Sequence, residues 1–158
     1  MKETNKNFIL GFLFLTLLSA SCSTDDDGSN NNDNGQQIIE IVSIVEAGTW
    51  RITSFIDSGD NETSDFNGYD FTFQLNGTLS ASNGSNTVAG TWSVTDSGSN
   101  DDSSDDIDFN IFFDVPDTNP FEDLNDDWDI VMYSENKIDL IDISGGNGGT
   151  DTLTFEKN

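Results

Sequence analysis

The most constraining feature of this chain is a series of short segments in which apolar and polar side chains alternate. Residues 69–75 place an aromatic or aliphatic side chain at every second position, and residues 107–113 repeat the pattern. A period of two puts the apolar side chains on one face of a β-strand, and no helix would produce it. Asn-Gly pairs at 76–77 and 83–84 are typical of tight hairpins, and the first predicts a type I′ turn. The chain after Gly48 therefore predicts antiparallel β-structure.

We expect eight strands in this part of the chain, most of them joined by short hairpins. Their expected ranges are 50–57, 69–75, 78–82, 87–95, 107–113, 128–133, 137–144 and 150–156. Short connections favour a meander over a parallel sheet, which needs long crossovers. An eight-stranded sheet with one apolar face removes its edges by closing into an up-and-down barrel, whose interior is filled by side chains or holds one small ligand. A β-sandwich is the alternative, although the cysteine and tryptophan pattern of immunoglobulin domains is missing.

Two of these strands carry more detailed predictions. In the first strand, Trp50, Ile52 and Ile56 alternate with polar residues and are expected to share the inner face. In strand 137–144 the apolar positions change phase, which predicts a β-bulge near Leu140.

Helical structure is expected at two places. Apolar residues at positions 38, 41, 42 and 45 have helical spacing and predict a short helix after Gln37 that ends before Gly48. Asn119 followed by proline is typical of an N-cap with proline at the first helical position, so residues 120–125 are expected to form one or two helical turns.

Residues 1–21 are expected to be a lipoprotein signal peptide. Two lysines precede an apolar run over residues 8–18, which at about 1.5 Å per residue is shorter than a hydrocarbon core of roughly 30 Å. Small residues then precede Cys22, the one cysteine, and this arrangement resembles the lipobox of bacterial lipoproteins, in which the cysteine is lipidated. The alternative is an ordinary secretory signal followed by a free thiol. In the lipoprotein interpretation, Cys22 carries a lipid anchor that holds the protein at a membrane.

Residues 22–36 are expected to be a flexible tether rich in acidic residues and asparagine. The stretch after Cys22 is too polar to offset the entropy of ordering it. Its Ser-Thr followed by three aspartates resembles the export signal of Bacteroidota lipoproteins, which implies a location at the outer face of the outer membrane. A plain solvated linker is the alternative. Residues 37–158 are then the barrel domain.

The charge of the chain excludes several classes of function. It has 30 acidic residues, 5 basic residues and no histidine, which gives a formal charge of −25. Nucleic acids are excluded as partners, because phosphate binding depends on Lys and Arg. Without histidine, a Ser-His-Asp system and Cys/His zinc sites are excluded as well. We expect a protein that is not an enzyme and has no cofactor, and a glycosidase that uses a carboxylate pair remains a further hypothesis.

Three segments contain oxygen ligands suited to calcium, namely 101–106, 123–129 and 145–151. None has the spacing of an EF-hand loop. The Gly-rich segment approaches one copy of a β-roll repeat, a motif that acts in stacks. We therefore expect solvated acidic loops and no metal site, with calcium binding as the alternative.

Gly48-Thr49-Trp50 ahead of a meander resembles the lipocalin Gly-x-Trp signature. Gly68 to Phe73 and Gly90 to Trp92 are similar to strand motifs of lipocalin-like lipoproteins of Bacteroidota. The resemblance covers residues 48–158 and implies a barrel with Trp50 at its base. In lipocalins an arginine of the last strand lies beside this tryptophan, whereas this chain has Lys157 there.

The same resemblance implies a small apolar or amphipathic ligand. Aromatic side chains line such a cavity or pack in the core, and Trp92, Phe73 and Tyr133 are the candidates for ligand contact. A protein-interaction or structural module of the cell surface is the alternative function.

Overall fold

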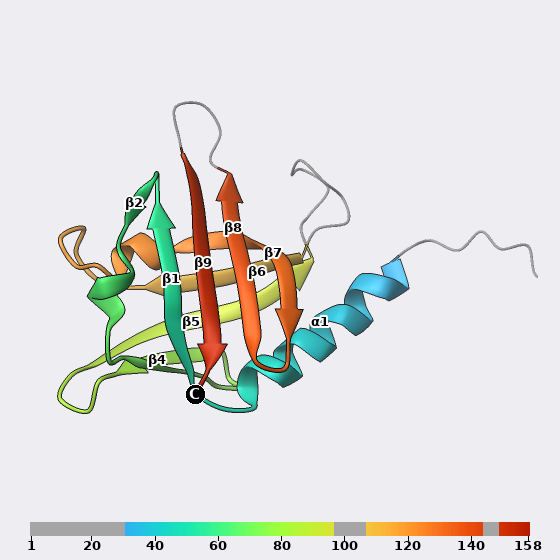
Figure 1. Cartoon of the computed structure of the whole chain (residues 1–158). Helices are drawn as coiled ribbons and strands as arrows, with labels where there is room; N and C mark the ends of the chain where they lie inside the picture. The colour runs from blue at the N-terminus through green and yellow to red at the C-terminus, as the bar shows by residue number, and fades with distance from the viewer. Residues whose placement is uncertain (1–30, 97–106, 144–148) are drawn as a thin grey trace, which may run out of the picture.

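The computed structural model describes residues 31–96, 107–143 and 149–158. These residues form one helix, nine strands and two 3-10 helices around a single core (Figure 1). The helix is α1 (Asn31–Glu46), and the 3-10 helices are η1 (Thr63–Phe66) and η2 (Glu122–Leu124). The strands are β1 (Trp50–Asp57), β2 (Asp60–Asn61), β3 (Asp70–Phe73), β4 (Thr78–Ser82), β5 (Thr87–Asp96), β6 (Ile107–Phe113), β7 (Asp126–Ser134), β8 (Lys137–Ile143) and β9 (Thr150–Lys157).

The strands form an antiparallel up-and-down barrel. From β3 to β9 each strand pairs with the next along the chain, and β9 returns to pair with β1 from Trp50↔Lys157 to Ile56↔Thr152. Strand β3 completes the ring on the other side of β1, while the two-residue β2 is a short addition to β1. The prediction of an eight-stranded barrel is confirmed, and the sandwich alternative is wrong.

Aromatic side chains fill the interior of the barrel. The ring of Phe73 lies 5.3 Å from that of Trp92 and 5.6 Å from those of Phe109 and Phe155, and all three pairs are edge-to-face. A buried side chain of this size contributes roughly 1.5–3 kcal/mol by leaving water, and each well-oriented ring pair adds about 0.5–1.5 kcal/mol. The interior is therefore a packed core.

Helical elements close the core on two sides. Ile41 and Val45 of α1 are buried in it, as are Phe66 of η1 and Phe121 beside η2. The Phe121 ring lies 5.3 Å from Phe66 and 5.0 Å from Phe113, so it joins η2 to the end of β6. In Figure 1, α1 and the green η1 segment lie on opposite sides of the barrel.

The helix begins earlier than the apolar pattern predicts. Its apolar face confirms the expected spacing, but α1 starts at Asn31 and not after Gln37, so it includes part of the segment expected to be a tether. The Asn34 side chain donates a hydrogen bond to Asp96 Oδ1 at 2.8 Å, which fastens the first turns of α1 to β5. This long-range polar contact stabilises the first turns of the helix, and the local composition does not reveal it.

Two predictions, one of an inward-facing residue and one of the position of a β-bulge, need correction. In β1 the pairing with β9 shifts register between Ile52 and Ser54, and Phe55 is buried in place of Ile56. The bulge predicted near Leu140 lies in the partner strand β7, where the pairing shifts between Ile130 and Met132, while β8 remains regular against β9.

The first hairpin also differs from the prediction. A type I′ turn requires a positive φ at both central residues. Here Gly77 has a φ of +79°, but the φ of Asn76 is not positive. Gly77 N donates to Gln74 O at 2.9 Å, so the loop is a three-residue connection that ends in a left-handed glycine. Leu75, expected on the inner face, is exposed because β3 ends at Phe73.

Two side chains replace strand pairing where the ladders stop. Thr63 Oγ1 accepts a hydrogen bond from Phe55 N at 2.8 Å and donates to Phe55 O at 3.3 Å. At the end of β6, Asn125 accepts from Phe113 N at 2.6 Å and donates to Phe113 O at 3.0 Å. Each side chain satisfies a backbone pair that would otherwise cost free energy on burial. A single helical turn is present within the expected range 120–125, but η2 covers only Glu122–Leu124 and Phe121 stands at its N-cap position. Asn119 Oδ1 instead accepts from Phe121 N at 3.0 Å in the turn before η2, so the predicted N-cap at Asn119 is wrong.

Trp50 lies at the junction of the helix, the first strand and the last strand. Its indole nitrogen donates to Val45 O at 2.8 Å, and Lys157 Nζ lies 4.9 Å from its ring centre. A lysine ammonium over a tryptophan face is stabilised by the ring quadrupole. A Cβ at Gly48 would lie 3.4 Å from Lys157 Cε. Lys157 therefore occupies the place beside the tryptophan that the resemblance assigns to an arginine.

We predict that Gly90→Ala destabilises the protein by about 1–3 kcal/mol, because the added Cβ would lie 2.5 Å from Phe112 O and 2.7 Å from Phe113 Cδ1. Urea unfolding followed by tryptophan fluorescence measures the change. Gly35→Ala is the matched control: apart from its chain neighbours and the backbone of its own helix, no atom lies within 4 Å of the added Cβ, and alanine favours the helix by up to about 1 kcal/mol. Equal stability of Gly90→Ala and wild type would contradict the prediction.

Candidate functional site

The structure does not bring the three predicted ligand residues together. Phe73 and Trp92 lie against each other in the core, and the Trp92 indole nitrogen donates to Gln74 O at 3.0 Å. Tyr133 lies elsewhere, with its hydroxyl 3.5 Å from Glu40 Oε2 of α1. Because the interior is filled, the available space for a ligand lies outside the barrel. Cys22 and the acidic segment 101–106 lie outside the described residues.

A groove of about 450 Å³ lies between α1 and β7. Its walls include Ile41 of α1, Ile107 of β6 and the residues of β7 from Ile130 to Tyr133. Gln37 and Asp129 supply polar groups to the same groove. A concave site with an apolar wall and a few polar groups is typical of small-molecule sites.

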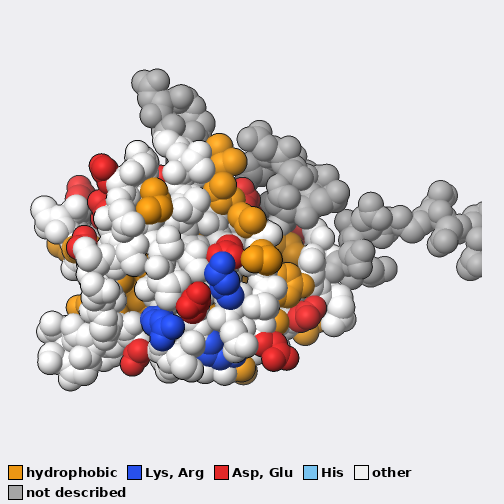
Figure 2. Space-filling model, viewed as in Figure 1, with side chains coloured by type: hydrophobic (Ala, Val, Ile, Leu, Met, Phe, Trp, Pro, Cys, Tyr) orange, Lys and Arg blue, Asp and Glu red, His pale blue; other side chains and the backbone are white. Residues whose placement is uncertain are grey.

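The β-bulge in β7 creates the apolar wall of this groove. Ile130 pairs with Leu140, whereas Met132 pairs with Asp139, so Val131 is the extra residue. Consequently two consecutive apolar side chains point outward, Val131 with 63% and Met132 with 56% of their surface exposed. The same shift turns Tyr133 toward the core and α1. Figure 2 shows apolar side chains gathered on the surface over β7 and β8.

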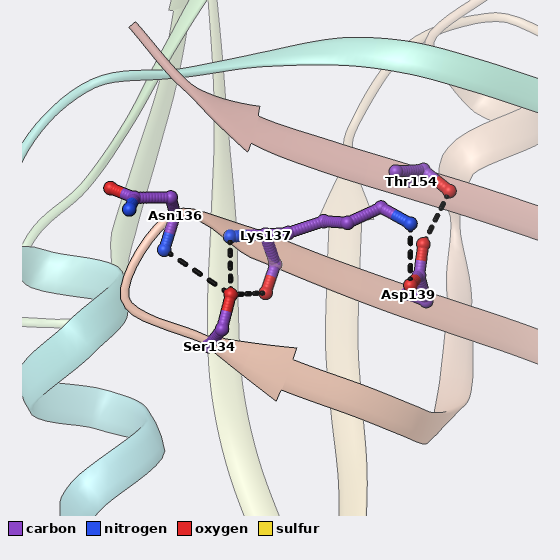
Figure 3. Close-up of polar contacts among 5 residues, drawn as sticks. All are labelled: Ser134, Asn136, Lys137, Asp139 and Thr154. Atoms are coloured by element: carbon purple, nitrogen blue, oxygen red, sulfur yellow. Dashed lines mark hydrogen bonds and ion pairs between the residues drawn. The ribbon is translucent and has the colours of Figure 1, made fainter.

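The hairpin that follows the bulge is held by side-chain contacts (Figure 3). Ser134 Oγ accepts from Lys137 N at 3.1 Å and donates to Lys137 O at 3.3 Å. Farther along β8, Asp139 accepts from Thr154 Oγ1 at 2.8 Å and pairs with Lys137 Nζ at 2.8 Å. These contacts fix β8 between β7 and β9, so the bulged strand has a rigid neighbour.

The sequence contained a signal for this groove that the prediction did not use. Residues 130–133 are four consecutive apolar or aromatic side chains in a strand that otherwise alternates. Such a run is incompatible with one regular inner face, and a bulge resolves it by turning two of the side chains to the surface.

Acidic side chains gather at two other places. Burial, followed by repulsion from Asp123, raises the pKa of Glu62, and burial followed by repulsion from Asp57 raises the pKa of Asp123. At the start of β7, burial raises the pKa of Asp126 to about 6. The side chain of Asp127 and the charge of Asp142 act in the same direction, whereas the hydrogen bond from Asp127 N lowers this pKa. Within residues 31–96, 107–143 and 149–158, no group of three or more such side chains has the arrangement of a metal site.

Comparisons with known proteins found a similarity to solved structures alone. No family model matches the chain, and no curated protein matches it. A crystal structure of a DUF4847 family protein from Bacteroides vulgatus is similar, with 18% sequence identity over 75% of this chain and 97% of that chain and a TM-score of 0.45. Among the described residues, no helix has both the length and the apolar character needed to cross a membrane.

We predict that Asp126→Asn makes the protein more stable at pH 7.5, on the order of 1 kcal/mol, and has little effect at pH 4. The pKa of Asp126 rises from 3.8 to about 6 on folding, so the contribution of this carboxyl to stability falls as pH increases through that range. An asparagine side chain stays neutral, so the variant does not lose stability as the pH rises through this range. Urea midpoints at the two pH values measure the difference, with exposed Asp117→Asn as the control. The same stability change at both pH values would contradict the assignment.

Proposed function

We propose that this protein is a lipid-anchored, non-enzymatic barrel of the cell envelope that binds a small amphipathic ligand in the groove between α1 and β7. The observation that carries the proposal is the pair of exposed apolar side chains, Val131 and Met132, in the wall of that groove. Exposing two neighbouring apolar side chains costs free energy in water, which a bound apolar group would recover.

The packed interior argues for a site outside the barrel. A ligand inside would have to displace rings such as Phe73, Phe109 and Phe155, each less than 2% exposed. Displacing one large side chain from a packed core costs several kcal/mol. The expected ligand chemistry is therefore retained, but its expected place inside the barrel is replaced by the external groove.

The charges around the groove restrict the polar end of the ligand. Gln37 and Asp129 line it, and none of the described lysines or arginines does. With 30 acidic residues in the chain, an anionic headgroup would be repelled. The ligand is therefore an apolar molecule with a neutral or cationic polar group.

The lipid anchor rests on the sequence before α1. An acylated Cys22 would hold the barrel at a bilayer, because two acyl chains are enough for stable anchoring. The acidic export-like segment after Cys22 supports a place on the outer face of the outer membrane. A domain of this charge has no electrostatic affinity of its own for anionic lipid, so the anchor would supply all of its attachment.

We predict that a small molecule copurifies with the full-length protein and is lost about tenfold in Met132→Glu, since a carboxylate in the apolar wall disfavours an apolar ligand. The protein is extracted from its own membranes in a polyoxyethylene detergent, and bound molecules are identified by mass spectrometry. Ile39→Glu is the matched control, because Ile39 is also 63% exposed on α1 but does not line the groove. Wild-type protein without any copurifying small molecule, or equal loss in both variants, would refute groove binding.

We also predict that Cys22→Ser moves the protein from the membrane fraction to the soluble fraction without changing its melting temperature. The substitution removes the thiol that would carry the acyl chains and leaves residues 31–158 unchanged. Membrane fractionation with immunoblotting, together with thermal melting, measures both effects. A Cys22→Ser variant that still sediments with membranes would show that the anchor lies elsewhere.

A further inference from the structure

A second groove, of about 730 Å³, lies on the outer face of the barrel over β5 and β6. Its polar side chains stand in register on three neighbouring strands. Ser93 pairs with Asn110, and Asn110 pairs with Asp127, so one row crosses β5, β6 and β7. Neighbouring strands lie about 4.8 Å apart, which spaces a hydroxyl, an amide and a carboxylate evenly across the groove.

An exposed aromatic ring lies next to this polar row. Phe112 pairs with Thr91 of β5 and lines the groove. The last pair between β6 and β7 is Ile111↔Asp126, so β7 does not extend alongside Phe112, and 55% of its surface remains exposed. A phenyl ring of this exposure costs free energy in water unless a ligand covers it.

The polar side chains retain hydrogen-bonding capacity. Asn110 uses its amide nitrogen to donate to Thr95 Oγ1 at 2.9 Å and to Ser93 O at 3.5 Å, so its carbonyl oxygen is the group available to accept from a ligand. Asn76, at the tip of the first hairpin, accepts from Thr78 N at 3.1 Å through its carbonyl oxygen and retains its amide nitrogen as a donor. The exposed hydroxyls of Thr91 and Ser93 can both donate and accept.

The charge of the groove selects against anions. Asp126 and Asp127 line it, and none of the lysines and arginines in the described part of the chain does. A phosphate, sulfate or carboxylate ligand would therefore meet repulsion and no counter-charge. A carboxylate beside amides and hydroxyls instead accepts hydrogen bonds from neutral hydroxyl groups.

From this arrangement we infer that the outer face of β5 and β6 is a non-catalytic binding site for a neutral oligosaccharide. A pyranose ring has an apolar C–H face, which covers the negative face of an aromatic ring such as Phe112. Its edge carries hydroxyls that pair with the row formed by Ser93, Asn110 and Asp127. This site is separate from the groove between α1 and β7, so it does not depend on the proposed function of that groove.

The test is isothermal titration calorimetry on the full-length protein in a polyoxyethylene detergent, which carries no sugar headgroup. The probes are cellohexaose, maltohexaose, xylohexaose and mannohexaose, with a heparin hexasaccharide as the anionic comparison. We expect at least one neutral hexasaccharide to bind and the heparin fragment not to bind. Phe112→Ala should weaken binding about tenfold. Phe112→Tyr keeps an aromatic ring at this position and should bind as tightly as the wild type.

Ile143→Ala is the matched control, because Ile143 is 66% exposed on β8 and does not line this groove, so binding should be unchanged. Melting temperatures of all variants show whether a loss of binding reflects unfolding. The inference is overturned if none of the neutral hexasaccharides binds or if heparin binds equally well. It is also overturned if Phe112→Ala binds as wild type while folded, or if the oligosaccharide is recovered shortened.

Discussion

The pairing of β1 with β9 is the interaction on which the rest of the structure depends. It joins the first and last strands over most of their length, while β1 meets β3 at a single pair, Trp50↔Phe71. Closure removes the exposed edges that an open meander would present. It also gives the apolar faces of all the strands one shared interior. Trp50 anchors this seam, since it contacts α1 through Val45 and the end of β9 through Lys157.

Because aromatic side chains fill the interior of the barrel, the binding sites that we propose lie on its outer surface. The interior rings form a continuous cluster, and α1, η1 and η2 contribute side chains that complete it. Both grooves consequently arise from departures from regular pairing. One follows the bulge beside Val131, and the other lies where β7 stops short of Phe112. Irregular positions at barrel rims re-aim side chains, and here they supply the exposed apolar groups.

The charge distribution is consistent with neutral or cationic ligands. In Figure 2 the lysine and arginine side chains lie near one another over β1, β8 and β9. Each of them has an interaction partner: Arg51 pairs with Glu156 at 3.5 Å, Lys137 pairs with Asp139, and Lys157 lies over the ring of Trp50. The Arg51–Glu156 pair is exposed and contributes little to stability. None of the three described cations lines either groove, so neither groove offers them to an anion.

The sequence by itself determined the all-β class and most of the strand ranges, and it favoured the barrel over a sandwich, because strands with one apolar face and short connections can bury that face by closing into a ring. It also placed Trp50 and Ile52 on the inner face of the first strand, and both are buried. It did not reveal β2, and it extended the second expected strand past Phe73. Only the tertiary structure decided that Phe55 and not Ile56 faces inward, that the bulge lies in β7, and that the interior is full. Those outcomes depend on pairing between different strands, where a shift of one residue exchanges the two faces of a strand. The local sequence of one strand does not specify that register.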